Sequence, residues 1–263
     1  MLEIIRNEIE RFKTGEEKYN HLRECLQVLL LKIVYEGGFF RSLAFTGGTA
    51  MRIVFGLRRF SEDLDFSLIQ ENGYNFGKAT SYVRRQLGLF NLDAEISAGK
   101  EGNVHKMDCK FINVLFEIGL SALQGQRLLI RLEIDTNPPG GYKTETSLVN
   151  RMFMFTVNHF DLPSLFSCKI HACLFRRYTK GRDFYDLLWF LGKKVKPNLK
   201  VLNNAIAQTE KKPAEVNEEN FREFLLEKLE RVDFSKARKD VERFVEDKKE
   251  LDLLNRETIT KLI

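Results

Sequence analysis

The chain has 263 residues, of which 43% are hydrophobic and 30% charged, and this length is sufficient for one large domain or two smaller ones with apolar cores. No apolar stretch is long enough to cross a bilayer, and the N-terminal segment MLEIIRNEIERFK is too charged for a secretory signal. We therefore expect a cytoplasmic protein with no membrane partner.

The cysteines and histidines form no metal or disulfide pattern. The four cysteines contain no CxxC pair, so we expect them to be reduced and mostly buried. No two of the four histidines have the spacing of metal ligands, and we do not expect a histidine-based metal site.

The net charge of +5 is concentrated in one part of the chain. Residues 163–198 contain eight Lys or Arg and two Asp, a net charge of +6, whereas residues 199–263 contain fourteen basic and fifteen acidic residues, a net charge of −1. The first 162 residues are therefore about neutral. A basic segment of this kind suits a polyanion or a phosphate-bearing ligand. A solvated helix surface is the alternative interpretation of the same residues.

The first part of the chain shows a helical period, followed by alternating strand and helix patterns. An apolar stripe predicts a helix that ends near Glu36, with Gly37 as its C-cap. Beyond it we predict strands at residues 43–46, 63–69, 92–98, 104–120, 128–136 and 151–160, and helices at residues 48–56 and 75–90.

From Pro163 onward the pattern is helical throughout. We predict helices at residues 163–177, 182–191, 199–208, 218–230, 234–247 and 251–262, of which the last three are highly charged and amphipathic, as in a small bundle. The sequence thus predicts an α+β fold. A mixed-sheet domain with N-terminal helices occupies residues 1–160, and an all-helical domain occupies residues 161–263.

Two aspartates lie one residue apart within an apolar strand pattern. Asp63, Asp65 and Ser67 share one face of that strand, because side chains alternate along a strand. The two carboxylates lie about 6–7 Å apart at their backbones and can converge on one Mg²⁺. Without a cation they would repel each other, and one would be protonated. The alternative is a strand end whose aspartates are merely exposed to solvent.

Two glycines precede these aspartates by one predicted helix. Gly47 and Gly48 follow a predicted strand and open a helix through Thr49. Glycine allows a phosphate to approach the backbone closely, and a helix N-terminus favours an anion. The spacing fits neither a Walker loop nor a Rossmann fingerprint. A phosphate-binding turn followed by a metal-binding strand is what a nucleoside triphosphate with its metal requires.

The segment GGTAMRIVFGLRRFSEDLDFSL resembles the signature of the nucleotidyltransferase AbiEii/AbiGii toxin family, with its GGTALR and R-x-SEDLDF motifs. Two further segments resemble the family, IRLEIDTNPP and KIHACLFRRYTKGRDFYDL, so that the resemblance covers roughly residues 43–188. It implies a polymerase-beta-like minimal nucleotidyltransferase fold. It also implies a metal-dependent enzyme that uses Mg²⁺ or Mn²⁺ and transfers a nucleoside monophosphate from an NTP substrate.

The resemblance assigns the metal and catalytic carboxylates to Asp63, Asp65 and a third acid on a neighbouring strand. In IRLEID, Ile130, Leu132 and Ile134 are expected to face inward, while the intervening side chains share the other face. Glu133 matches the family's acid best, and Asp135 is the alternative. An ordinary amphipathic strand would show the same alternation.

The resemblance places the nucleotide-binding residues in three segments. Lys169 is expected to bind the triphosphate, although a lysine on a mostly apolar helix can also snorkel to solvent. Asp186 would be a catalytic acid or would orient the lysine, whereas Asp183 has an alternative explanation as an acid in the first turn of a helix. The other residues expected near the nucleotide are Gly47, Gly48, Thr49, Arg59, Arg182, Arg176, Arg177 and Lys180.

The resemblance also implies the toxin of a bacterial toxin–antitoxin or abortive-infection pair. We expect an RNA acceptor, first of all the end of tRNA, and a separately encoded antitoxin that need not touch the toxin. Two alternatives remain at this point. The chain could be a nucleotidyltransferase that modifies a protein or a small molecule, or a non-catalytic nucleotide- or RNA-binding module with the same fold.

Overall fold

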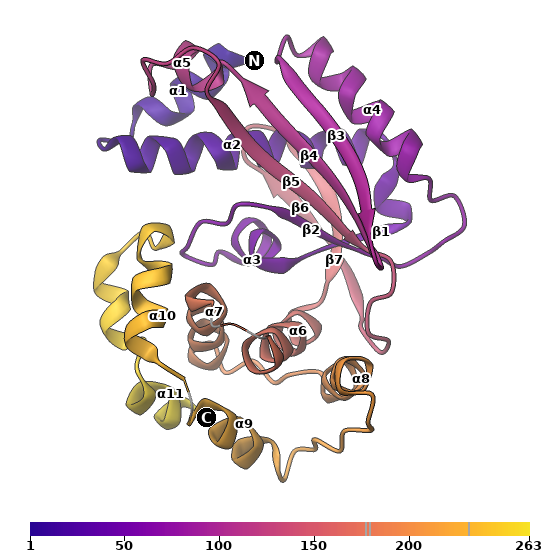
Figure 1. The fold of residues 1–263 in the computed structure, drawn as a ribbon, viewed down its shortest axis with the longest axis vertical. Coiled ribbons are helices and arrows are strands. Elements are labelled where there is room, and N and C mark those ends of the chain that lie inside the picture. The colour runs from indigo at the N-terminus through magenta and orange to yellow at the C-terminus, as the bar shows by residue number, and fades with distance from the viewer. Residues whose placement is uncertain (177, 179, 231) are drawn as a thin grey trace. The chain divides into compact units, whose positions relative to one another are not determined.

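The computed structural model describes residues 1–176, 178, 180–230 and 232–263, so Arg177, Thr179 and Arg231 lie outside the described residues. The chain divides into two compact units (Figure 1). The first, which we call the sheet unit, contains Met1–Val54, Phe60–Asn137 and Thr146–His159. The second, the helical unit, contains Phe55–Arg59, Pro138–Glu145 and Phe160–Ile263.

A seven-stranded mixed sheet forms the framework of the sheet unit, in the order β3-β4-β5-β2-β1-β7-β6. Strands β3, β4 and β5 pair antiparallel, β5 pairs parallel with β2, β2 antiparallel with β1, and β1 parallel with β7. The strands are β1 (Leu43–Thr46), β2 (Leu64–Leu68), β3 (Ala94–Glu101), β4 (Val104–Ile112), β5 (Arg127–Asp135), β6 (Thr144–Asn150) and β7 (Met154–Phe160). The predicted α+β class with a mixed sheet is confirmed.

Helices of the sheet unit pack on the apolar face of this sheet. They are α1 (Leu2–Glu10), α2 (Gly15–Glu36), the short 3₁₀ helix η1 (Phe39–Arg41), α3 (Gly47–Phe55), α4 (Phe76–Leu89) and α5 (Val114–Glu117). Helix α2 begins in a capping box, in which Thr14 Oγ1 accepts from the Glu17 N–H at 3.1 Å and the Glu17 carboxylate accepts from the Thr14 N–H at 2.9 Å. Helices α2 and α4 contact each other, and α2 also contacts β5.

Strand β5 shows why one sheet face is apolar and the other polar. Its alternate side chains Leu128, Ile130, Leu132 and Ile134 are buried in the core beneath the helices. The intervening positions are exposed or half-buried, as the predicted alternation requires. The polar face of β5 therefore carries Glu133 and Asp135.

The helical unit consists of short helices around a central pair. Helix α6 (Leu162–Phe175) packs against α7 (Gly181–Gly192) and α8 (Leu199–Glu210), and α10 (Phe234–Val241) packs against α7. Phe166 of α6 stacks on Phe190 of α7 with 4.5 Å between ring centroids. The remaining elements are α9 (Phe221–Leu229), η2 (Glu242–Phe244), η3 (Lys248–Leu253) and α11 (Arg256–Leu262). Within the described ranges, no helix combines the length and apolar character needed to span a bilayer.

The structure differs from the sequence predictions in several places. The helix predicted at 251–262 begins only at Arg256, after the 3₁₀ helix η3. The strand predicted at 104–120 ends at Ile112, because Asn113 adopts a left-handed conformation (φ 59°) that starts α5. Strand β6 was not predicted, since its side chains are mostly polar and exposed. The helix predicted at 234–247 ends at Val241 and continues only as η2. Strand β2 begins at Leu64, so Asp63 lies immediately before the strand.

Candidate active site

The turn from β1 into α3 brings Gly47 against Asp65. Gly47 is the first residue of α3 and has a φ of 73°, a conformation that favours glycine. A Cβ added to Gly47 would lie 1.9 Å from Asp65 Oδ2. Position 47 must therefore be glycine for two reasons, its backbone conformation and the space that the Asp65 carboxylate occupies.

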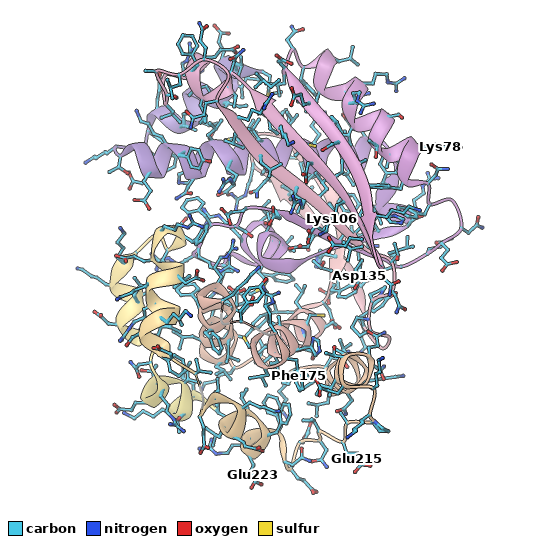
Figure 2. The ribbon with its side chains drawn as sticks, in the orientation of Figure 1. Lys78, Lys106, Asp135, Phe175, Glu215 and Glu223 are labelled. Carbon is cyan, nitrogen blue, oxygen red and sulfur yellow. The ribbon has the colours of Figure 1, made fainter. Side chains whose placement is uncertain are left out.

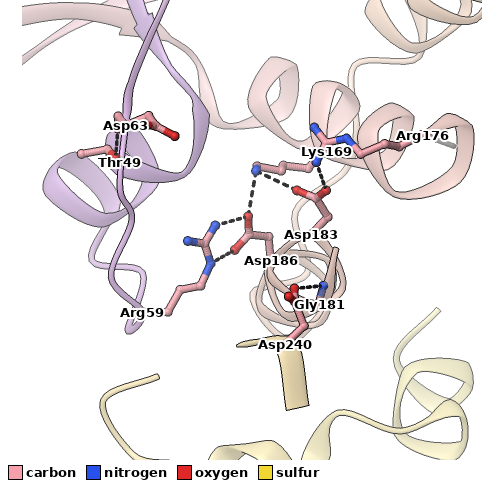
Figure 3. A network of polar contacts seen from close by, with 9 residues as sticks. All are labelled: Thr49, Arg59, Asp63, Lys169, Arg176, Gly181, Asp183, Asp186 and Asp240. Atoms are coloured by element: carbon pink, nitrogen blue, oxygen red, sulfur yellow. Dashed lines mark hydrogen bonds and ion pairs between the residues drawn. The ribbon is translucent and has the colours of Figure 1, made fainter. Parts of the chain in front are cut away.

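Thr49 fixes the backbone that carries Asp63. The Thr49 side chain is fully buried, and its hydroxyl donates a hydrogen bond of 2.5 Å to the carbonyl oxygen of Asp63. Thr49 lies directly beside the Asp63 backbone (Figure 3). Since its hydroxyl is engaged in this way, Thr49 holds the loop that precedes β2.

Register across the sheet places the predicted third acid beside Asp65. The Cα partner of Asp65 is Thr46 on β1 and Glu133 on β5, and the partner of Glu133 on β4 is Lys106. Asp65 and Glu133 are thus like charges at neighbouring positions, an arrangement that destabilises a sheet in the absence of a compensating charge. Lys106 Nζ lies 3.9 Å from Glu133 Oε1 and also contacts Glu101.

Asp135 lies two residues further along the same face, beside Ser67. Its carboxylate accepts a hydrogen bond of 2.9 Å from the Asn137 N–H and so forms the turn that ends β5 (Figure 2 labels Asp135 and Lys106). Burial raises the pKa of Asp135. Of the two candidate acids on β5, Glu133 is the one registered with Asp65.

Asp63, Asp65 and Glu133 are brought to one end of the β2–β5 pair, but they do not form a closed ligand cluster. Among the residues that the structure describes, no group of three or more His, Cys, Asp or Glu side chains is positioned to hold a metal ion.

A second polar cluster lies entirely within the helical unit, and we call it the ion network (Figure 3). The Arg59 guanidinium binds Asp186 in a bidentate manner, with Nε–Oδ1 and Nη2–Oδ2 distances of 2.6 Å each. Lys169 Nζ lies 2.9 Å from Asp186 Oδ2 and 3.2 Å from Asp183 Oδ1. Arg176 Nη1 binds Asp183 Oδ2 at 2.7 Å. The network therefore alternates cations and carboxylates, with three cations to two anions.

Burial makes this alternation necessary. The side chains of Arg59 and Asp186 are 2% and 0% exposed, and that of Lys169 is 15% exposed. Burial alone lowers the pKa of Lys169, but Asp186 and Asp183 outweigh it, so the pKa is raised above its ordinary value. Burial likewise raises the pKa of Asp183, but Lys169 and Arg176 outweigh it and lower the pKa overall. Lys169 and Asp183 are therefore both charged at neutral pH.

Local sequence explains where the network side chains lie. Asp183 and Asp186 are three residues apart, so they share one face of α7. Lys169 lies on α6, which begins with Asp161 as its N-cap, accepting from the Ser164 N–H at 3.0 Å. Arg182 lies over the Phe244 ring, 4.5 Å from its centroid. The expected contribution of Arg177 lies outside the described residues.

Sequence reasoning missed two features of the network. The first is the pairing of Arg59 with Asp186, which are 127 residues apart. The second is Asp240 on α10, whose carboxylate accepts a hydrogen bond of 2.7 Å from the Gly181 N–H at the start of α7. Neither pairing has a local sequence signal, because each joins distant elements.

Comparison with known proteins places the chain in a family. Two solved structures from Helicobacter pylori are similar to it. The first is JHP933, which is 15% identical over 90% of this chain and 94% of that chain, with a TM-score of 0.46. The second is a protein provisionally assigned as a nucleotidyltransferase, which is 16% identical over 87% of this chain and 93% of that chain, with a TM-score of 0.45. No protein with a curated description matches the chain. The family model described as nucleotidyl transferase AbiEii toxin, type IV toxin–antitoxin system, matches residues 29–256. The chain therefore belongs to the AbiEii nucleotidyltransferase toxin family, as the resemblance predicted.

Proposed function

We propose that this protein transfers a nucleoside monophosphate from an NTP to an RNA acceptor in a metal-dependent reaction. The observation that carries the proposal is the register of Asp65 with Glu133, next to the glycine turn that opens α3. Two carboxylates side by side, one of them against a glycine backbone, form an oxygen-rich site suited to a hard cation.

Carboxylate oxygens are ligands that Mg²⁺ and Mn²⁺ prefer, so the chemistry of these side chains suits either ion. Asp65 and Glu133 are neighbouring like charges, and a divalent cation would remove their repulsion. We assign Asp63, Asp65 and Glu133 as the metal-holding residues, with Asp135 as the alternative to Glu133. Bound there, the metal would supply Lewis-acid stabilisation of the charge on the transferring phosphate.

We assign the phosphates of the NTP to the glycine turn and to Lys169. Gly47 and Gly48 lack side chains, and α3 presents its N-terminal amides and positive dipole end at this turn. Lys169 has a raised pKa and therefore carries a positive charge, which supports a role in binding anions. In this proposal Lys169 contacts the triphosphate, whereas Asp183 and Asp186 are positioning residues.

Arg59 and Arg182, which were both expected near the nucleotide, receive different roles. The Arg59 guanidinium is engaged with Asp186, so we propose that Arg59 acts by holding Asp186 and, through it, Lys169. Arg182 lies over Phe244 and joins α7 to the C-terminal helices. Direct phosphate binding by Arg182 would require its guanidinium to leave that ring.

The charge distribution supports an RNA acceptor. The net charge of +6 over residues 163–198 suits a polyanion, and we propose the end of tRNA as the acceptor. This substrate would place the reaction in the cytoplasm. The type IV toxin–antitoxin assignment of the family implies an antitoxin, and we propose that it is separately encoded and need not bind the toxin directly.

The experiment that tests this proposal is incubation of the pure protein with total RNA, Mg²⁺ and each labelled NTP in turn. We expect label in RNA of tRNA size with one or a few of the NTPs, and none with an Asp65→Asn protein. Label in protein or in a small molecule would instead support the first alternative. No label with any NTP, in a protein that still arrests growth when expressed, would support a non-catalytic binding module.

A further inference from the structure

Helix α10 and the segment after it bind the start of α7. The Asp240 carboxylate accepts from the Gly181 N–H, an amide in the first turn that has no partner within the helix (Figure 3). A Cβ added to Gly181 would lie 1.9 Å from the Ala237 carbonyl oxygen. Helix α10 thus packs directly on the backbone of α7, two residues before Asp183.

The same C-terminal segment binds the backbone that carries Arg59. Val245 forms an isolated antiparallel β-bridge with Arg59. The Glu246 N–H donates to the Arg58 carbonyl oxygen at 3.3 Å. The chain therefore holds the Arg59 backbone by a strand-like contact, which explains why residues after Val241 do not continue the α10 helix.

Glu250 joins these two attachments. Its carboxylate lies 2.8 Å from Arg58 Nη1 and also accepts a hydrogen bond from the Tyr185 hydroxyl. Tyr185 directly precedes Asp186 on α7, and Arg58 directly precedes Arg59. A single carboxylate therefore links the immediate neighbours of both members of the buried ion pair.

We propose that residues 240–250, here called the C-terminal clamp, are a positioning element for the ion network, and that Asp240 and Glu250 are its positioning residues. The clamp holds the Arg59 backbone and the α7 backbone in one geometry, so that the Arg59–Asp186 pair orients Lys169. This inference rests on the proposed role of Lys169 in nucleotidyl transfer. It assigns a function to the C-terminal helices, which carry no recognisable motif of their own.

The test compares the Asp240→Ala/Glu250→Ala protein with the wild type and with a matched control, Asp233→Ala. Asp233 caps α10 itself, accepting from the Lys236 N–H at 3.0 Å, so its loss removes a similar capping bond without touching α7 or Arg59. The first measurement is the hydrogen-exchange rate of the Arg59 Nε–H by ¹⁵N NMR, with the signal assigned by its loss in Arg59→Lys. The second is kcat and KM for the NTP.

We expect the double variant to exchange the Arg59 Nε–H at least tenfold faster than the wild type and to lose at least tenfold in kcat, with a smaller change in KM. Asp240→Asn should restore most of the loss due to Asp240→Ala, because the amide oxygen can still accept from Gly181. Asp233→Ala should change neither readout by more than about twofold.

Two results would overturn the inference. One is an unchanged Arg59 exchange rate in the folded double variant. The other is an equal effect of Asp233→Ala, which would mean that Asp240 and Glu250 contribute only to the general stability of the fold. If the double variant did not fold, Glu250→Gln alone would be compared with the wild type by the same exchange measurement, with the same criteria. The exchange measurement needs no substrate, so it tests the clamp even if the protein transfers no nucleotide. A failure of the proposed transfer reaction would appear only in the kinetic measurement.

Discussion

The two polar clusters of this protein differ in how their carboxylates and cations are arranged. In the sheet unit, Asp65 and Glu133 are like charges at neighbouring strand positions, and the Glu133 side chain is 33% exposed. In the helical unit, cations and carboxylates alternate, and Asp186 is fully buried between Arg59 and Lys169. In the first cluster Glu133 has the nearby cation Lys106, and we propose that a bound divalent metal adds further positive charge, whereas in the second cluster the cations Arg59, Lys169 and Arg176 contact the carboxylates directly.

We propose that this difference separates metal binding from the positioning of Lys169. A site that must take up a metal keeps oxygen ligands together at an energetic cost in the free protein. A network that must hold one lysine in place satisfies its charges internally, because an unpaired buried charge is strongly destabilising. The comparison leads to four predictions.

Asp65→Asn should lower kcat/KM by about 10³-fold or more, because it removes a carboxylate from the proposed metal site. Glu133→Gln should have an effect of the same order, whereas Asp135→Asn should change kcat/KM by less than about tenfold, since the Asp135 carboxylate forms a turn. The measurement is single-turnover transfer of labelled NMP. A larger effect of Asp135→Asn than of Glu133→Gln would mean that Asp135, and not Glu133, is the third acid of the proposed metal site.

Lys169→Ala should lower kcat by about 10²–10³-fold, as expected for the loss of one electrostatic stabiliser of the transition state. The loss of NTP affinity should be smaller. Lys169→Arg should restore part of the rate, because a planar guanidinium does not replace a point charge. In cells, growth arrest should be relieved by Lys169→Ala. A folded Lys169→Ala protein with normal transfer and normal growth arrest would make Lys169 a structural residue only.

The consecutive residues Arg58 and Arg59 should differ sharply in their contribution to stability. Arg59→Met leaves the buried Asp186 without its two bonds of 2.6 Å and should cost about 3–5 kcal/mol in the free energy of unfolding. Arg58→Met removes ion pairs of a guanidinium that is 58% exposed and should cost at most about 1 kcal/mol. Urea unfolding at pH 7 measures both. Equal costs would mean that the ion network is not the stabilising cluster described above.

Acid should weaken the ion network through Asp183. Its folded-state pKa lies below the ordinary value of 3.8, since Lys169 and Arg176 outweigh the opposing effect of burial. The stabilisation is therefore present above about pH 4 and is lost as the pH falls through the folded-state pKa. We expect Asp183→Asn to be about 1–3 kcal/mol less stable than the wild type at pH 7, and the difference to shrink below pH 4. A difference that stayed constant between pH 7 and pH 2 would contradict this.

The sequence predicted the elements with a clear period and missed those determined by tertiary contacts. The alternation in β5 correctly assigned its buried face, and the apolar stripe correctly located α2. The polar edge strand β6 has no such pattern, and the left-handed residue Asn113 ends β4 without a glycine to mark the turn. The break after Val241 follows from the β-bridge of Val245 with Arg59, which no local pattern encodes.

The candidate site shows the same limit. Strand alternation placed Asp65 on one face of its strand and both Glu133 and Asp135 on one face of theirs, and the family resemblance favoured Glu133. Which strands are neighbours depends on the order of the whole sheet. The lysine and both acids of the ion network lie in one recognisable segment. Their partner Arg59 and the clamp residues Asp240 and Glu250 come from distant parts of the chain, and only the packing of the helical unit brings them together.

The most direct measurement is the Mn²⁺ affinity of the wild type, Asp65→Asn and Asp183→Asn, determined by electron paramagnetic resonance. If the carboxylates of the sheet unit hold the metal and those of the helical unit only position Lys169, Asp65→Asn should weaken Mn²⁺ binding at least tenfold, and Asp183→Asn should leave it within about twofold of the wild type. An unchanged affinity in Asp65→Asn, or an equal loss in Asp183→Asn, would contradict the division of roles between the two clusters.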